Sequence, residues 1–75
     1  MPIIARLQYC VIRMYFYDHN PPHFHIDTPQ GRALMAIRTL DVLAGNVDAR
    51  AEREARDWAR DQEENLLALW EEFNP

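Results

Sequence analysis

The chain has 75 residues, of which 48% are hydrophobic and 11% aromatic, and its net charge is −4. This length suits one small domain, expected over residues 1–75, and the apolar content is too high for a disordered chain. The excess of acidic residues argues against general binding of nucleic acid, because such binding depends on neutralising phosphates with basic side chains.

The first half of the chain, residues 1–45, has the composition of a β-meander. Runs of β-branched and aromatic residues alternate with turn-forming segments that contain Pro, Asn, Asp and Gly. The segment His23–Asp27 alternates polar and apolar residues strictly, as a half-buried strand does. Three strands are predicted at Cys10–Tyr17, His23–Asp27 and about Arg32–Arg38, with Thr39–Leu43 as a short fourth strand and Ile3–Leu7 as an edge strand.

The first hairpin has a predictable register if its loop covers residues 18–22. The opposed residues would then be Tyr17 with His23, Tyr15 with His25, and Arg13 with Asp27 on one face, and Phe16 with Phe24 and Met14 with Ile26 on the other. This register gathers apolar side chains on one face of the sheet and places an Arg–Asp pair on the other.

The second hairpin turns at Thr28–Gly31, and its register has two alternatives. A four-residue turn would direct Ala33, Met35 and Ile37 into the core. A bulged three-residue loop would direct Leu34 and Ala36 there instead. Both faces of this strand are apolar, so the pattern does not choose between them.

Residues 48–73 are predicted to be helical. Asp48 is the expected N-cap, followed by a stripe of residues at steps of three and four. The stripe consists of Ala51, Ala55, Trp58, Ala59, Gln62, Leu66, Leu69 and Phe73. It predicts one amphipathic helix over residues 49–73, packed on the sheet, with a kink near Asp61 as the alternative. Leu67 and Trp70 lie beside the stripe and are expected to contact a partner.

The excess of negative charge lies entirely in this C-terminal segment. Residues 1–48 contain four arginines and four aspartates, whereas residues 49–75 contain four arginines and eight acidic residues. The acidic side chains of the last turns are interpreted as a solvated face, or as a docking surface for a basic partner.

All three histidines of the chain lie in the segment Asp18–His25. His23 and His25 are two residues apart on a predicted strand, so their side chains share a face at a spacing of about 7 Å. That spacing allows both imidazoles to bind one divalent metal such as zinc, with His19 or Asp18 as the next ligand. The alternative is that both are ordinary solvent-facing residues of an alternating strand.

The same face of the hairpin collects aromatic and basic side chains, which suit a local patch for single-stranded nucleic acid. The candidate binding surface comprises Arg13, Tyr15, Tyr17, His19, His23, His25, Arg32, Leu67 and Trp70. An enzymatic alternative is a ribonuclease-like reaction that uses His23, His25 and Tyr17, with Arg13 holding phosphate. The chain contains no serine or lysine and lacks a Gly-rich phosphate loop, so non-catalytic binding is favoured.

The chain is expected to be cytoplasmic. Its single cysteine, Cys10, forms no intrachain disulfide and is interpreted as a small strand hydrophobe. Residues 1–6 lack the apolar core of a signal peptide, and no stretch approaches the roughly 18 apolar residues of a membrane span.

Several segments together resemble the family called domain of unknown function 4160. They are Ile12–Phe16, Asp18–His25 with its Pro-His-Phe-His motif at Pro22–His25, Leu40–Gly45, and Trp58-Ala59. The family consists of small bacterial and archaeal proteins. The resemblance implies a partner-binding or regulatory component of a toxin–antitoxin-like two-gene system. Its partner would be the product of the adjacent gene. Independently of the resemblance, the small core of so short a chain favours pairing with a partner or with a second copy in a homodimer.

Overall fold

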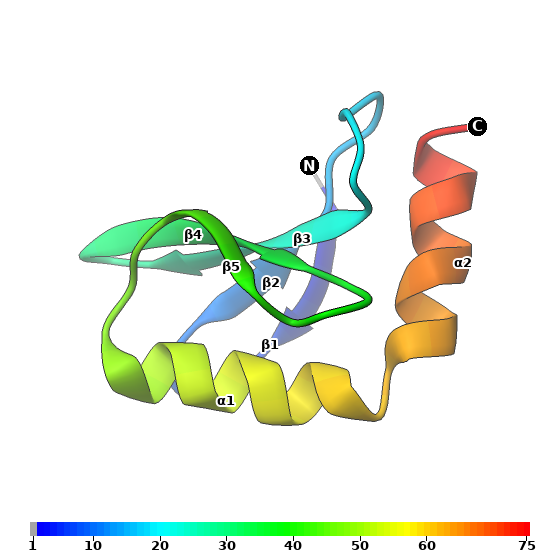
Figure 1. The fold of residues 1–75 in the computed structure, drawn as a ribbon. Coiled ribbons are helices and arrows are strands. Elements are labelled where there is room, and N and C mark those ends of the chain that lie inside the picture. Colours follow the sequence, from blue (N-terminus) through cyan, green and yellow to red (C-terminus); the bar gives the residue numbers. More distant parts are fainter. Residues whose placement is uncertain (1) are drawn as a thin grey trace.

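The computed structural model describes residues 2–75 and shows an α+β fold in which an antiparallel sheet precedes two helices (Figure 1). The elements are β1 (Ile3–Arg6), β2 (Val11–Arg13), β3 (His23–Thr28), β4 (Gly31–Ala36), β5 (Val42–Gly45), α1 (Ala49–Arg60) and α2 (Glu63–Phe73). The strands neighbour one another in chain order. The meander prediction is therefore confirmed, and the sheet has five strands because both the short fourth strand and the edge strand at the start of the chain form. Within residues 2–75, neither helix is long and apolar enough to cross a membrane.

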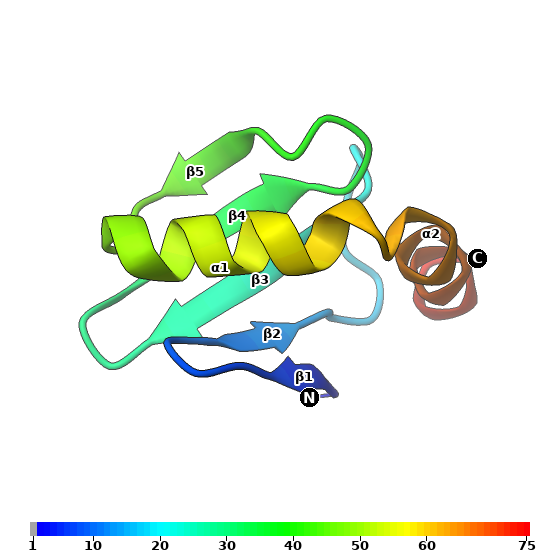
Figure 2. The same ribbon diagram turned by 90° about the horizontal axis from the view of Figure 1, so that it is seen from below.

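Helix α1 covers one face of the sheet, whereas α2 stands beside the sheet at one end of the central strands (Figures 1 and 2). The core lies between the sheet and α1, where Phe24 of β3 contacts the ring of Trp58. The helix presents Ala51, Ala55 and Ala59 to the sheet, all buried. Small side chains at these positions let the helix backbone approach the larger strand residues closely.

The prediction of one helix over residues 49–73 is wrong, and the alternative of a break near Asp61 describes the chain better. Helix α1 starts at the predicted N-cap, Asp48, whose carboxylate accepts a hydrogen bond from the Ala51 N–H at 2.8 Å. It ends at Arg60, and Asp61 and Gln62 have non-helical ψ angles of 7° and 11°. The apolar stripe continues across this break, so periodicity alone did not reveal that the chain changes direction.

The first hairpin has a longer loop than predicted. β2 pairs only over Val11–Arg13, and Arg13 lies opposite His25, two residues away from the predicted register. A shift of two residues keeps the side chains that still pair, those of Val11–Arg13, on their predicted faces, because side chains alternate with a period of two. Residues 14–22 therefore leave the sheet. Phe16 does not meet Phe24 in the core but is 55% exposed and contacts Phe73 of α2.

The second hairpin adopts the four-residue turn. Thr28 pairs with Gly31, and the Thr28 hydroxyl accepts a hydrogen bond from the Gly31 N–H at 3.0 Å. Ala33, Met35 and Ile37 are buried, as that alternative predicts. The following chain turns before β5, which begins at Val42 instead of at the predicted residue 39.

Candidate functional site

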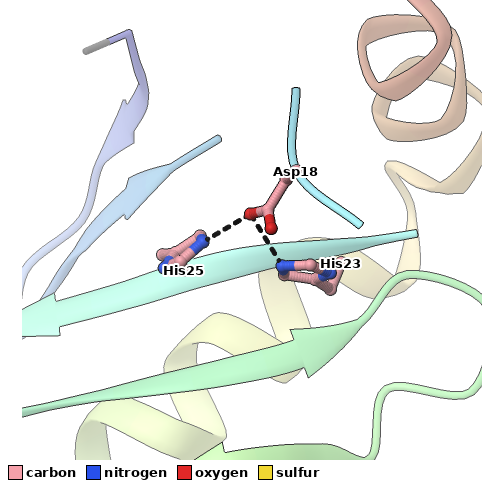
Figure 3. Close-up of side chains that lie close together, drawn as sticks. All are labelled: Asp18, His23 and His25. Atoms are coloured by element: carbon pink, nitrogen blue, oxygen red, sulfur yellow. Dashed lines mark hydrogen bonds and ion pairs between the residues drawn. The ribbon is translucent and has the colours of Figure 1, made fainter. Parts of the chain in front are cut away.

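Three polar side chains converge on the face of the sheet that points away from α1 (Figure 3). His23 and His25 project together from β3, with ring centroids 5.3 Å apart, while Phe24 between them points into the core. Asp18 reaches over both rings from the 14–22 loop. Its Oδ2 atom lies 3.0 Å from Nε2 of His23 and 3.2 Å from Nε2 of His25. The strand therefore supplies two ligand-type nitrogens, and the loop places one carboxylate oxygen between them.

The C-terminal end of α2 holds Asp18 in this place. The Asp18 N–H donates to the side-chain oxygen of Asn74, and the neighbouring Tyr17 N–H donates to the Phe73 carbonyl at 3.2 Å. Tyr17 has a φ of 56°, in the left-handed region, which turns the chain back toward the sheet at this point. The second carboxylate oxygen of Asp18 accepts from the His19 N–H at 2.9 Å. These three hydrogen bonds thus hold the loop at Tyr17–His19 and orient the Asp18 carboxylate.

Each of the two ring nitrogens of His23 lies close to an oxygen atom of a neighbouring residue. His23 is 3% exposed, and Nδ1 lies 2.7 Å from the carbonyl oxygen of Pro21. A carbonyl only accepts hydrogen bonds, so Nδ1 carries a proton and donates it. In the neutral ring, Nε2 then directs its lone pair at the carboxylate oxygen of Asp18. A cation between these two atoms, either a proton or a metal ion, removes the repulsion between them.

Burial and mutual contacts shift two pKa values in the cluster. Burial lowers the pKa of His25 below the ordinary histidine value, against the opposing effect of its hydrogen bond with Asp18. Burial of Asp18 acts to raise the pKa of its carboxyl, but hydrogen bonds from His25 and the His19 N–H, together with the charge of His23, outweigh it. The pKa of Asp18 is therefore lowered, and its carboxylate is ionised at neutral pH.

The two nitrogen–oxygen distances in the cluster match those between neighbouring ligands of one metal ion. Ligands about 2.1 Å from a metal and 90–110° apart are separated by roughly 3.0–3.4 Å. The two nitrogen–oxygen distances, 3.0 and 3.2 Å, fall in this range, and all three ligand atoms lie within 4.8 Å of one another. The Nδ1–H of His23 donates to a backbone carbonyl, an arrangement that is usual for metal-binding histidines.

The structure brings some of the predicted site residues together and separates others. Tyr15 contacts the edge of the His25 ring, with centroids 4.3 Å apart. Arg13 forms its ion pair with Asp27 at 2.8 Å despite the shifted register. The His19 side chain is 95% exposed and stands outside the cluster. Of the two candidates for the next ligand, Asp18 lies between the two imidazoles. His19 contacts only the outer oxygen of Asp18, Oδ1, through its backbone N–H at 2.9 Å and its ring Nδ1 at 3.4 Å.

The prediction that Trp70 is left for a partner is wrong. Trp70 is 5% exposed, and its ring lies against His23 with centroids 5.1 Å apart. The reason is the break between the helices, which turns α2 so that Trp70 faces the end of β3. Leu67 is partly buried against the core. Trp70 therefore forms a wall of the site instead of an external contact.

Two supporting residues were missed at the level of sequence. Asn74 lies 56 positions from Asp18, and no local pattern connects them. The Pro21 carbonyl is a backbone group, so residue type gives no indication of its role. The Pro21-Pro22 pair indicates only a stiff turn next to His23.

The comparisons with known proteins give one match. The family model described as Domain of unknown function (DUF4160) matches residues 10–71, which include the entire Asp18–His25 segment. Neither the curated proteins nor the solved structures contain a match for this chain. The matched region covers β2 to β5, α1 and most of α2, and it agrees with the resemblance seen in the Pro-His-Phe-His motif. The chain belongs to the DUF4160 family.

Proposed function

We propose that this protein binds a divalent transition-metal ion through Asp18, His23 and His25. The observation that carries the proposal is the convergence of two imidazole Nε2 atoms on one carboxylate oxygen, at 3.0 and 3.2 Å. Two histidines and one carboxylate form a mixed nitrogen and oxygen donor set that suits zinc or iron(II) and leaves coordination positions open.

The limited exposure of the three side chains supports a site that selects one small ion. The side-chain exposures are 4% for His23, 19% for His25 and 16% for Asp18. A bound ion would therefore exchange part of its water shell for these three protein ligands. The ion would also balance the negative charge of Asp18, which is costly to keep in a partly buried place without a cation.

The experiment is a metal-binding measurement on protein purified without a histidine tag. After treatment with a chelator and dialysis, the chain is titrated with Zn²⁺, and with Co²⁺ as a spectroscopic substitute. We expect one ion per chain and visible Co²⁺ absorption bands of a nitrogen- and oxygen-ligated ion. Asp18→Asn and His25→Gln should each weaken binding at least tenfold, because each removes one ligand.

The matched control is His19→Ala. This histidine belongs to the same loop, but its side chain is exposed, so the variant should bind the ion as the wild type does. A metal content of the titrated protein no higher than that of a protein-free blank would refute the proposal. An equal loss of affinity in His19→Ala would show that histidines bind the ion without the predicted geometry.

A second proposal concerns the partner that the family resemblance implies. We infer that α2 presents an acidic surface to a basic protein, the product of the adjacent gene in a two-gene system. The supporting observation is that its four acidic residues, Glu63, Glu64, Glu71 and Glu72, are all exposed. None of them takes part in the ion pairs found within residues 2–75.

Co-expression with the adjacent gene, followed by size-exclusion chromatography with light scattering, tests this second proposal. We expect a complex that the wild type forms and that a variant with all four glutamates changed to glutamine loses. Asp41→Asn, an exposed acid in the turn before β5, is the control and should leave the complex intact. A chain that remains a monomer or a homodimer, without forming a complex with the product of the adjacent gene, would contradict the proposal.

A further inference from the structure

The cluster of Asp18, His23 and His25 opens into a surface hollow of about 570 Å³. Asp18 and His25 line the hollow together with Tyr15, Tyr17 and Arg32. The hollow therefore combines two of the three candidate metal ligands, an arginine and two phenol rings. A ligand that binds there can contact the bound metal ion, the guanidinium group of the arginine and an aromatic ring at the same time.

The two arginines of this face differ in how firmly they are paired. Arg13 Nε lies 2.8 Å from one oxygen of Asp27, and its side chain is 29% exposed. Arg32 Nε lies 3.9 Å from the other oxygen, and its side chain is 77% exposed. Arg32 is therefore the side chain that can turn its planar donor group toward an anion in the hollow. The sequence-based hypothesis assigned phosphate binding to Arg13, which is held by Asp27.

The charge of this face depends on whether a metal ion is bound. Without an ion, the carboxylates of Asp18 and Asp27 balance Arg13 and Arg32. A divalent ion raises the local charge by two, so the hollow becomes cationic. The acidic excess of the chain lies in residues 61–75, which contain five acidic residues and no arginine, and α2 stands beside the sheet at one end of the strands (Figure 1). None of these five acidic residues lines the hollow, so the net charge of −4 does not by itself prevent anion binding there.

Exposed aromatic rings border the same hollow. Tyr17 is 86% exposed and Phe16 is 55% exposed, although large apolar rings normally gain from burial. The Tyr17 N–H donates to the Phe73 carbonyl and the Phe16 ring packs on the Phe73 ring, so the backbone of Tyr17 and the ring of Phe16 are held in place. Exposed rings beside a cationic hollow are suited to stacking with nucleic-acid bases.

We propose that the hollow beside Asp18 and His25 binds single-stranded nucleic acid, with a backbone phosphate on Arg32 and the metal ion and a base against Tyr17. This inference rests on the proposed metal site. Metal binding alone does not define which molecules the site binds, and the inference adds single-stranded nucleic acid as that class. Phosphate oxygens are suitable ligands for an open position on a divalent ion, and stacking tolerates any base.

The test is fluorescence anisotropy with labelled hexauridylate and hexathymidylate at low salt, using the full chain. The protein is measured after loading with Zn²⁺ and after removal of the metal, with metal content determined on the same samples. We expect binding by the loaded protein and at least tenfold weaker binding after metal removal. Arg32→Gln and Tyr17→Ala should each weaken binding about fivefold or more, with the metal content unchanged.

The matched control is Arg53→Gln, which removes an exposed arginine from α1 on the opposite face and should leave affinity unchanged. A loaded protein that binds neither oligonucleotide would overturn this inference and leave the metal site intact. Equal binding with and without metal, or an equal effect of Arg53→Gln, would also overturn it. Inorganic phosphate that competes as well as the oligonucleotides would show that the bases contribute nothing. Absence of metal from the loaded sample would instead refute the proposed metal site.

Discussion

At the scale of single residues, His23 differs most from what its position in the alternating strand suggests. An outward-facing strand histidine is ordinarily exposed, but here the 14–22 loop and Trp70 cover the ring. Both ring nitrogens have partners, the Pro21 carbonyl and the Asp18 carboxylate. Buried polar groups are costly unless they are paired, so this residue links the stability of the loop to the geometry of the site.

Replacing His23 should therefore destabilise the protein. His23→Ala leaves the Pro21 carbonyl without its donor and removes the ring that packs on Trp70. We expect a loss of about 2–4 kcal/mol in the free energy of unfolding, measured by urea denaturation of metal-free protein. His19→Ala should change it by less than about 0.5 kcal/mol, because that side chain is exposed. An equal change in the free energy of unfolding for His23→Ala and His19→Ala would contradict the stabilising role of the buried His23 ring.

The buried Cys10 allows a prediction about pH. Burial, together with the nearby carboxylate of Glu54, raises the pKa of the Cys10 thiol to about 12. The raised pKa means that folding favours the protonated thiol: this stabilising contribution is complete below the unfolded pKa of about 8.5 and is lost as the pH rises toward 12. We expect iodoacetamide to leave Cys10 unmodified at pH 8 in native protein and to alkylate it in urea, as followed by mass spectrometry. Rapid native alkylation would contradict the burial.

At the scale of elements, Glu54 connects α1 to the turn between β1 and β2. Its carboxylate accepts hydrogen bonds from the Gln8 N–H at 2.9 Å and the Tyr9 N–H at 2.8 Å. Charged acceptors form stronger hydrogen bonds than neutral ones, so Glu54→Gln should lower the free energy of unfolding by about 1–2 kcal/mol. Chemical denaturation of the variant measures this loss.

Glu52→Gln is the matched control for Glu54. Glu52 lies on the same helix but pairs only with Arg56, one turn further along, where both side chains are about a third exposed. Exposed ion pairs of this kind contribute about 0.3–0.5 kcal/mol. An effect of Glu52→Gln as large as that of Glu54→Gln would show that helix charge, and not the contact with the turn, determines stability.

The end of α2 determines the position of Asp18, and this relation is also testable. Asn74→Ala removes the acceptor of the Asp18 N–H, so the carboxylate is held less firmly over the histidines. Loss of a residue that orients a metal ligand typically lowers metal affinity 10–100-fold. We expect about a tenfold loss in a Zn²⁺ titration. Asn65→Ala, which changes an exposed asparagine of the same helix, should keep full affinity.

At the scale of the whole molecule, metal binding and folding should be coupled. The three ligands come from the loop and from β3, and the loop is held by α2, so the unfolded chain lacks the site. At a free Zn²⁺ concentration about 100 times its Kd, the folded state gains about 2.7 kcal/mol. For a domain of this size that corresponds to a rise of roughly 10–20 °C in Tm.

Thermal unfolding with and without Zn²⁺ measures this coupling. The rise in Tm should disappear when a chelator is added. For Asp18→Asn, which binds at least tenfold more weakly, the rise should be about half as large or smaller at the same Zn²⁺ concentration. A wild-type Tm that is unchanged by saturating metal would contradict coupled folding and binding. A rise of the same size in Asp18→Asn would show that the ion stabilises the chain at another place.

The sequence by itself determined the α+β class, the meander, the start of α1 at Asp48 and the common face of His23 and His25. These features depend on local patterns: alternation with a period of two defines the faces of a strand, and a capping residue marks the start of a helix. The faces remained correct even though the register shifted, because the shift was an even number of residues.

Only the tertiary structure decided which groups surround the two histidines. Asp18 reaches them because the chain leaves the sheet after Arg13, and Trp70 covers them because α2 turns away from α1 after Arg60. Both features involve contacts between residues more than 45 positions apart, Asp18 with Asn74 and His23 with Trp70. Local periodicity contains no information about such distant contacts, so the sequence identified the imidazoles but not the site that encloses them.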